Sequence, residues 1–186
     1  MSYCHAIENM TGDRKDLHKA YHDVLYGFPI HDDNELFGRL ILEINQAGLS
    51  WEIILKKEPA FRKAYDNFNI QKIATYTEAD RERLLSDAGI IRNRLKVNAA
   101  IENAKTIVSL QEEYGSFEKW LKHNHPLTKD EWVKLFKKTF KFTGGEIVNE
   151  FLMSTGYLPG AHSADCKIYH KILKEEPLWA QLQDKK

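Results

Sequence analysis

The chain has 186 residues, of which 42% are hydrophobic and 11% are aromatic, so it can bury a core as one domain or as two small helical lobes. No apolar run approaches the ~20 residues of a membrane span, and the first residues are too polar for a signal peptide, so we expect a cytoplasmic protein with no membrane partner. Lysine plus arginine and aspartate plus glutamate number 27 each. Because the charges balance, the protein has no strong net electrostatic field that would attract nucleic acid. Any contact with DNA must therefore come from a local group of cations.

Residue patterns typical of helices occur along most of the chain, and no pattern typical of a strand is evident, so the sequence predicts an all-α fold. The strongest helix begins at Asp32, has Glu35 in capping-box spacing, carries apolar residues at helical spacing and stops at Gly48. The segment 123–128 is a candidate junction between two lobes, and we expect the tail 167–186 to form a peripheral helix or arm. Further helices are expected at about 51–57, 59–68, 77–87, 95–114, 117–122, 129–140 and 146–155.

A carboxylate interrupts the apolar face of this strongest helix. At about 100° per residue, Glu43 projects close to Leu36, Leu40 and Ala47. Burying an ionised carboxylate without a partner costs on the order of several kcal/mol. Two interpretations stay open: a buried salt bridge to a lysine or arginine, or a carboxylate that reads a ligand at the floor of a pocket.

Aromatic residues lie near this carboxylate in the sequence. Trp51 follows the turn QAGLS, and Tyr21 and Tyr26 flank His22 in YHDVLYG. Aromatic walls around a carboxylate suit a planar heterocycle that is cationic or forms hydrogen bonds. Packing in the core explains each aromatic residue equally well.

The stretch LLSDAGIIRNRLKVNAAIENAK predicts a helical hairpin near 84–98. Its second helix starts with Arg92, Arg94 and Lys96, although cations are normally favoured at the opposite end of a helix. An anion docking there would explain this bias, since Gly89 lets the backbone approach a phosphate. The alternative is an ordinary helical hairpin with a solvated basic edge.

The two cysteines lie at opposite ends of the chain. In HSADC, His162 precedes Cys166 by four residues, and the other cysteine is Cys4. In a reducing compartment such cysteines favour free thiols or metal ligands over a disulfide. The spacing alone leaves rivals, because His18 and His22 are also four residues apart.

Several uncommon segments occur in one order: AYHD at 20–23, LE at 42–43, QAGLSW at 46–51, LKK at 55–57, DAGIIRNRLK at 87–96 and FKFTG at 140–144. From Cys4 to about Cys166, the chain resembles the 3-methyladenine DNA glycosylase I family. The resemblance implies the helix-hairpin-helix DNA glycosylase fold as a single domain over 1–186. The chain departs from the family pattern at 24–26, where Val-Leu-Tyr replaces the usual Asn-Glu-Trp, and at His18, where tyrosine is common.

The resemblance also implies one structural zinc ion per chain that joins the N- and C-terminal segments. The family's ligands fall on Cys4, His22, His162 and Cys166. Two thiolates and two imidazoles complete a closed tetrahedral site.

For function, the resemblance implies excision of 3-methyladenine from alkylated double-stranded DNA in base excision repair, by a monofunctional enzyme that leaves an abasic site and acts as a monomer. The nucleotide flips out of the duplex. The alternatives are a DNA-binding relative that lacks activity or has another specificity, and a structural protein held together by zinc.

The resemblance also implies which residues form the site. Glu43 is the catalytic group and recognises the base, and the further base contacts are Tyr21, Tyr26 and Trp51. The implied DNA contacts are Gly48, Leu49 (a wedge into the base stack), Gly89, Ile90, Ile91, Arg92, Arg94 and Lys96.

Overall fold

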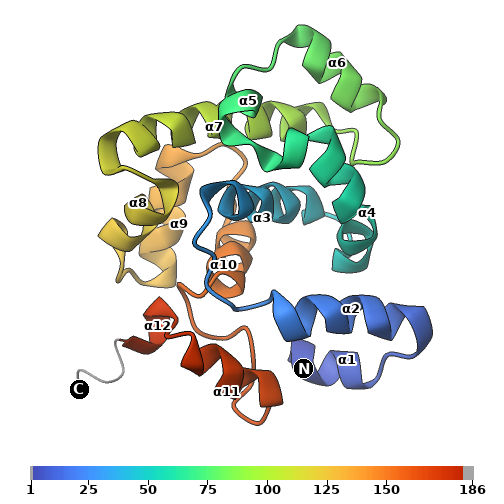
Figure 1. Ribbon diagram of the computed structural model, residues 1–186, viewed down its shortest axis with the longest axis vertical. Coiled ribbons are helices and arrows are strands. Elements are labelled where there is room, and N and C mark those ends of the chain that lie inside the picture. The colour runs from blue at the N-terminus through green and yellow to red at the C-terminus, as the bar shows by residue number, and fades with distance from the viewer. Residues whose placement is uncertain (1, 182–186) are drawn as a thin grey trace. The chain divides into compact units, whose positions relative to one another are not determined.

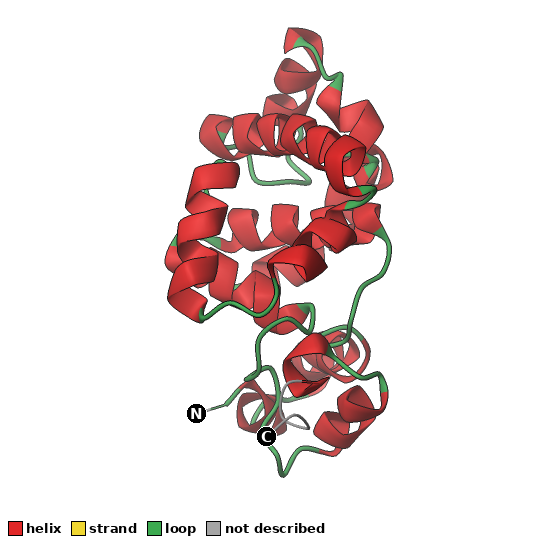
Figure 2. Ribbon diagram, turned by 90° about the vertical axis from the view of Figure 1, so that its left-hand side faces the viewer, coloured by secondary structure: helices red, strands yellow, loops and turns green. Residues whose placement is uncertain are grey.

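The computed structural model describes residues 2–181, and these residues contain helices and no strand (Figures 1 and 2). The all-α prediction is confirmed. The chain divides into two compact units, of which the first combines Met1–Ile30 with Asn149–Lys186 and the second is His31–Val148. Segment 123–128, the expected junction between lobes, instead lies inside the second unit, where it includes the end of one helix and the connection to the next. Among the described residues, no helix is long and apolar enough to cross a membrane.

The first unit brings the two ends of the chain together. Its core includes Ile168, Ile172 and Trp179, against which Phe28 packs from the N-terminal segment. The tail forms helices up to residue 181, and 182–186 lie outside the described residues. The helices of this unit are α1 (Tyr3–Glu8), α2 (Gly12–Val24), the C-terminal part of α10 (Gly145–Ser154), α11 (Lys167–Lys174) and α12 (Leu178–Gln181).

Gly27 allows the two ends to meet closely. Its N–H donates to the carbonyl of Ser154 at 2.9 Å. Its φ of +84° lies in the region that favours glycine, and a Cβ at this position would stand 2.8 Å from the Cβ of Ala161. The N-terminal segment can therefore approach the segment after α10 without a side chain between them.

The second unit contains the predicted helices of the middle of the chain. Asp32 caps the first of them, since its carboxylate accepts from the backbone N–H of Glu35 at 3.0 Å. Asp33 then accepts from the N–H groups of Phe117 at 2.7 Å and Glu118 at 3.0 Å, so one carboxylate joins the starts of two helices. The elements are α3 (Asp33–Gln46), α4 (Trp51–Ala64), η1 (Asp66–Phe68), α5 (Ile70–Ala74), α6 (Glu78–Ser86), α7 (Arg94–Tyr114), α8 (Phe117–Asn124), α9 (Lys129–Thr139) and the start of α10.

One predicted boundary is wrong. The two helices expected at 51–57 and 59–68 are the single helix α4, with Pro59 inside it, followed by the short η1. Proline in a helix interior removes a hydrogen bond and normally breaks the helix. Here Ile54 and Phe61 are both fully buried, so packing on either side of the proline holds the two halves in one helix.

Candidate functional site

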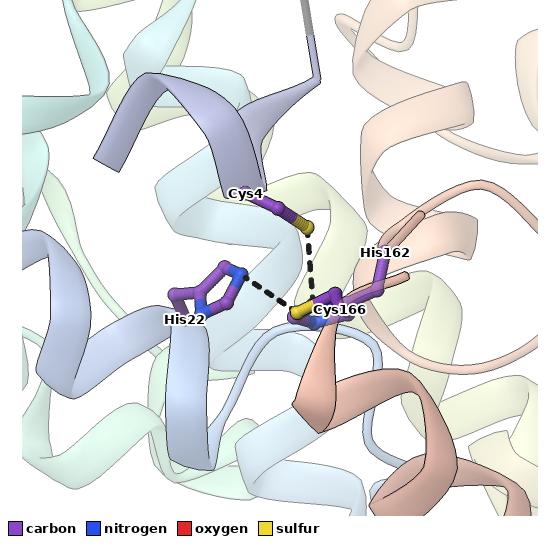
Figure 3. Close-up of side chains that lie close together, drawn as sticks. All are labelled: Cys4, His22, His162 and Cys166. Atoms are coloured by element: carbon purple, nitrogen blue, oxygen red, sulfur yellow. Dashed lines mark hydrogen bonds between the residues drawn. The ribbon is translucent and has the colours of Figure 1, made fainter. Parts of the chain in front are cut away.

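Four side chains of the first unit converge on one point (Figure 3). Cys4 comes from α1, His22 from α2, and His162 and Cys166 from the segment before α11. One donor atom from each lies within 4.8 Å of the other three. The Nδ1 atom of His162 lies 3.6 Å from both sulfur atoms, and the Nε2 atom of His22 lies 3.8 Å from the sulfur of Cys166.

The two histidines are held in the tautomers that a metal requires. Nε2 of His162 carries the ring proton and donates it to the carbonyl of Tyr26 at 2.8 Å, because a carbonyl can only accept. Nδ1 therefore has no proton, and its lone pair can bind a metal. By the same reasoning, Nδ1 of His22 donates to the carboxylate of Asp23 at 2.7 Å, which leaves Nε2 facing the sulfur atoms. Such partners of ligating histidines fix both the ring orientation and the tautomer.

The charge states of His162 and Asp23 suit metal binding. Burial lowers the pKa of His162, which favours the neutral imidazole that can bind a cation. Burial alone would raise the pKa of Asp23, but hydrogen bonds from Lys19 and His22 outweigh it and hold this pKa below its ordinary value. Asp23 is therefore a carboxylate at neutral pH and a strong acceptor for the His22 N–H.

These donors fit a tetrahedral zinc ion. Zinc bonds of about 2.0 Å to nitrogen and 2.3 Å to sulfur place neighbouring ligand atoms roughly 3.5 Å apart. Three of the nitrogen–sulfur distances, at 3.6, 3.6 and 3.8 Å, agree with that edge. His162 and Cys166 lie in a segment without helix, and Cys166 is the N-cap residue of α11.

The carboxylate of α3 is buried as the sequence predicts. Glu43 is only 4% exposed, and so is not directed into bulk solvent. Arg39, 6% exposed, lies one turn earlier on the same helix, at a spacing that brings two side chains into reach of each other. Both interpretations of Glu43 are thus still open, since a buried arginine is available as a partner. Trp51 begins α4 and is half-buried.

An aromatic cluster occupies the first unit. Tyr21 and Tyr26 are 5% and 7% exposed, and their ring centroids lie 5.5 Å apart. Sequence reasoning missed Tyr3, whose ring packs edge-on against Tyr26 and whose hydroxyl lies 2.8 Å from Nδ1 of His18. Burial raises the pKa of Tyr3, so its hydroxyl stays protonated at neutral pH. Its position next to Cys4 was the only available signal.

The turn between α3 and α4 is tightly held. Gly48 has a φ of +82°, and Leu49 follows it as a half-buried residue. The N–H of Leu49 donates to the carbonyl of Gln46 at 2.7 Å, and the side-chain amide of Gln46 donates back to the carbonyl of Leu49 at 3.0 Å. The turn therefore presents Leu49 on a fixed backbone.

The expected hairpin is the short turn between α6 and α7. The N–H of Gly89 donates to the carboxylate of Asp87 at 2.7 Å, and Lys57 of α4 donates to the Gly89 carbonyl at 3.1 Å. A Cβ on Gly89 would lie 3.0 Å from that of Ala60, so glycine permits close packing on α4. Ile90 is 3% exposed and serves the core, and Ile91 is half-buried.

The cations of this hairpin separate into two groups. Arg92 and Arg94 are exposed, and Arg94 lies 3.7 Å from Glu78 in a solvent-exposed ion pair. The expectation that Lys96 contacts DNA is corrected, because Lys96 is 5% exposed and its ammonium donates to the carbonyls of Asn45 at 2.9 Å and Ala47 at 2.7 Å. A cation at the start of α7 therefore serves the C-terminal end of α3, where the helix dipole favours positive charge.

Comparison with known proteins identifies similar chains over most of this length. Residues 11–132 match the family model described as methyladenine glycosylase. DNA-3-methyladenine glycosylase 1 of Escherichia coli is 35% identical over 172 residues, which cover 82% of this chain and 91% of the relative.

Solved structures agree with these matches. A structure of 3-methyladenine DNA glycosylase I from Staphylococcus aureus, described as the structural basis of 3-methyladenine recognition, has a TM-score of 0.77 at 29% identity and covers 90% of this chain and 97% of its own. A variant of 3-methyladenine DNA glycosylase I solved in complex with 3-methyladenine gives the same TM-score, identity and coverage.

Proposed function

Because this chain belongs to the methyladenine glycosylase family, we propose that it excises 3-methyladenine from alkylated double-stranded DNA, as a monomer, and leaves an abasic site. Relatives carry this activity in their names, and one was solved with the free base bound. The single observation in this chain that carries the proposal is the burial of Glu43 on α3, at 4% exposure. A carboxylate is kept in such a position where it has a charged partner to bind.

The chemistry of the lesion explains why a residue that recognises the base is sufficient for catalysis. Methylation at the ring nitrogen makes the purine electron-poor and weakens its bond to the sugar, so the enzyme has less bond cleavage to assist. Glu43 accepts hydrogen bonds from the edge of the purine, and its negative charge favours the alkylated base over the neutral parent. Glu43 is the residue to which we assign the catalytic effect, through recognition. Water completes the cleavage.

The remaining residues bind and position the DNA. Trp51, Tyr21 and Tyr26 provide aromatic surfaces for the flipped base, and such stacking is worth roughly 1–3 kcal/mol per base in comparable contacts. Leu49, next to Gly48 on its fixed turn, fills the gap left in the base stack. In the α6–α7 hairpin, the backbone at Gly89, Ile90 and Ile91 approaches the phosphates, and Arg92 and Arg94 supply the charge.

Zinc has a structural role in this proposal. Cys4, His22, His162 and Cys166 hold the ion, which cross-links the two ends of the chain and takes no part in bond cleavage, because four protein ligands leave no open position.

Release of 3-methyladenine from methylated DNA tests the proposal. The purified protein should release the free base without cutting the strand, and Glu43→Gln should release it far more slowly. No release above background by the wild type would instead favour a DNA-binding relative without activity. A changed substrate range is the second candidate, because Val24 and Leu25, 65% and 50% exposed, stand where the family pattern has a polar pair. A panel of alkylated purines separates the two.

A further inference from the structure

The ring of Tyr26 is tied to the C-terminal part of the chain by its hydroxyl. This hydroxyl donates to the carboxylate of Glu150 on α10 at 3.3 Å, and the bond joins two residues of the first unit that lie 124 positions apart. Tyr26 is 7% exposed and Glu150 is half-buried. A buried tyrosine hydroxyl normally has a hydrogen-bond partner, and a carboxylate is a stronger acceptor than a neutral group. Tryptophan, the usual family residue at this position, has no hydroxyl, so this bond comes with the tyrosine of this chain.

The backbone next to this ring is held by the same part of the chain. The carbonyl of Tyr26 accepts from Nε2 of His162 at 2.8 Å. The N–H of Gly27 donates at 2.9 Å to the carbonyl of Ser154, which lies one turn after Glu150 on α10. Helix α10 therefore holds this segment twice, through the backbone at Ser154 and through the side chain of Glu150.

Aromatic neighbours restrict the orientation of the Tyr26 ring. Its centroid lies 5.3 Å from that of Tyr3, with an interplanar angle of 88°, and 5.5 Å from that of Tyr21, with an angle of 38°. The bond from the hydroxyl to Glu150 adds a restraint at the end of the ring that is farthest from the backbone. A ring held at its backbone, by its neighbours and at its hydroxyl presents one fixed plane, and a ligand that stacks on a fixed plane costs little ordering entropy.

We propose that Glu150 is a positioning residue for the base site, whose carboxylate fixes the ring of Tyr26 in the plane on which the flipped base stacks. The inference rests on the proposed function, which makes Tyr26 an aromatic surface for that base. Glu150 acts through the hydroxyl of Tyr26, and a displacement of about 1 Å in such a supporting group can cost about 100-fold in rate. The alternative is that the bond only joins α10 to the N-terminal segment. Its loss would then lower stability and leave base binding unchanged.

Kinetics on methylated DNA test this role. Tyr26→Phe keeps the ring and removes the hydroxyl, and Glu150→Ala removes the acceptor. Each change should raise KM for 3-methyladenine release by roughly tenfold, the ratio expected for one hydrogen bond to a charged group. The value of kcat should stay nearly the same, because stacking acts equally before and during bond cleavage. A lower kcat at unchanged KM, together with a lower melting temperature, would show a structural role and overturn the proposal.

Further variants show whether Glu150 acts through the hydroxyl. In the double variant Tyr26→Phe/Glu150→Ala, KM should rise no further than in either single variant, because both changes remove the same bond. Glu150→Gln keeps an oxygen that can accept from the hydroxyl, so its KM should stay near that of the wild type. Additive effects in the double variant, or a KM in Glu150→Gln as high as in Glu150→Ala, would overturn the positioning role.

The matched control is Glu146→Gln on the same helix. Glu146 is exposed and lies 3.6 Å from Lys129, so its change removes the same charge from α10 without touching the hydroxyl of Tyr26. KM should not change in this control. A rise in KM equal to that of Glu150→Ala would show a general effect of charge on α10 and overturn the proposal.

Binding of the free base keeps this inference apart from the proposed function. Calorimetric titration with 3-methyladenine gives a dissociation constant that does not depend on cleavage, and Tyr26→Phe and Glu150→Ala should each raise it by roughly the same factor as KM. If the wild type binds the base but does not release it from DNA, and the variants bind it more weakly, the proposed excision fails and the role of Glu150 stands. If the wild type releases the base and the variants match it in KM and in dissociation constant, the role of Glu150 alone is wrong.

Discussion

The ammonium of Lys96 donates a 2.7 Å hydrogen bond to the carbonyl of Ala47, the C-cap residue of α3. It donates a second bond to the carbonyl of Asn45 at 2.9 Å. The last carbonyls of a helix have no partner within the helix, so this lysine both satisfies them and fixes the end of α3 to the start of α7. The turn that carries Gly48 and Leu49 begins immediately after this point.

Lys96→Met should therefore reduce stability and leave the affinity for DNA phosphates largely unchanged. Leaving two carbonyls at a buried helix end without their charged donor costs roughly 1.5–3 kcal/mol of unfolding free energy. Thermal and urea unfolding measure the loss. A variant that stays stable but whose salt dependence of DNA binding falls by one contact would restore Lys96 to the DNA-binding set.

Glu43→Gln separates the two interpretations of the buried carboxylate. As a reader of a cationic base, Glu43 contributes a charge-assisted hydrogen bond, and its loss should lower kcat/KM for 3-methyladenine release by roughly 10- to 150-fold, with the melting temperature unchanged or raised. As a structural partner of Arg39, its loss should mainly lower the melting temperature. A double-mutant cycle with Arg39→Gln measures the coupling between the two side chains. Strong coupling in stability with unchanged kcat/KM would refute the reader role.

Removal of a zinc ligand should destabilise the first unit. Structural zinc sites supply about 10–16 kcal/mol of apparent binding free energy in small peptides, so Cys166→Ala should lose its metal and show a large drop in melting temperature. The exposed His170 of α11 offers a control, and His170→Ala should keep the metal. Elemental analysis well below one zinc per chain in the wild type would contradict the four-ligand site.

Asp23→Asn tests whether a residue that is not itself a zinc ligand increases the affinity of the site for zinc. This carboxylate accepts from the ring N–H of His22 at 2.7 Å, and partners of this kind typically change metal affinity by about 10- to 100-fold when removed. Competition with a chelator measures the affinity. An unchanged zinc affinity would show that His22 is oriented without help from Asp23.

The exposed arginines of the hairpin should act on DNA binding alone. Reversal of Arg92 and Arg94 to glutamate should weaken duplex binding and lower the salt slope by about 1.8 or more. Little stability should be lost, because the ion pair of Arg94 with Glu78 is exposed to solvent. Unchanged DNA affinity at low salt would favour the zinc-held structural protein without a role on nucleic acid.

The sequence predicted those helices that have capping residues at their ends and apolar residues at helical spacing. Asp32 caps α3 as its spacing to Glu35 indicates, and α7 ends at Tyr114 as predicted, with Gly115 at a φ of +89° after it. α2 gave no such signal. Its buried residues are His18, Tyr21 and His22, whose mixed polarity leaves no apolar periodicity, and its N-cap Thr11 makes no side-chain capping bond.

The sequence by itself determined which chemical groups are available: two thiols, two imidazoles, and a carboxylate on the apolar face of a helix that its own caps define. Tertiary structure alone decided which atoms of those groups face one another and which partners they bind. His162 exposes Nδ1 to the sulfur atoms because Nε2 is bonded to a carbonyl 136 residues earlier, and Lys96 turns toward α3 because two carbonyls 49 and 51 residues away lack partners. Caps and periodicity act over one or two turns of chain, whereas such pairings depend on how distant segments pack.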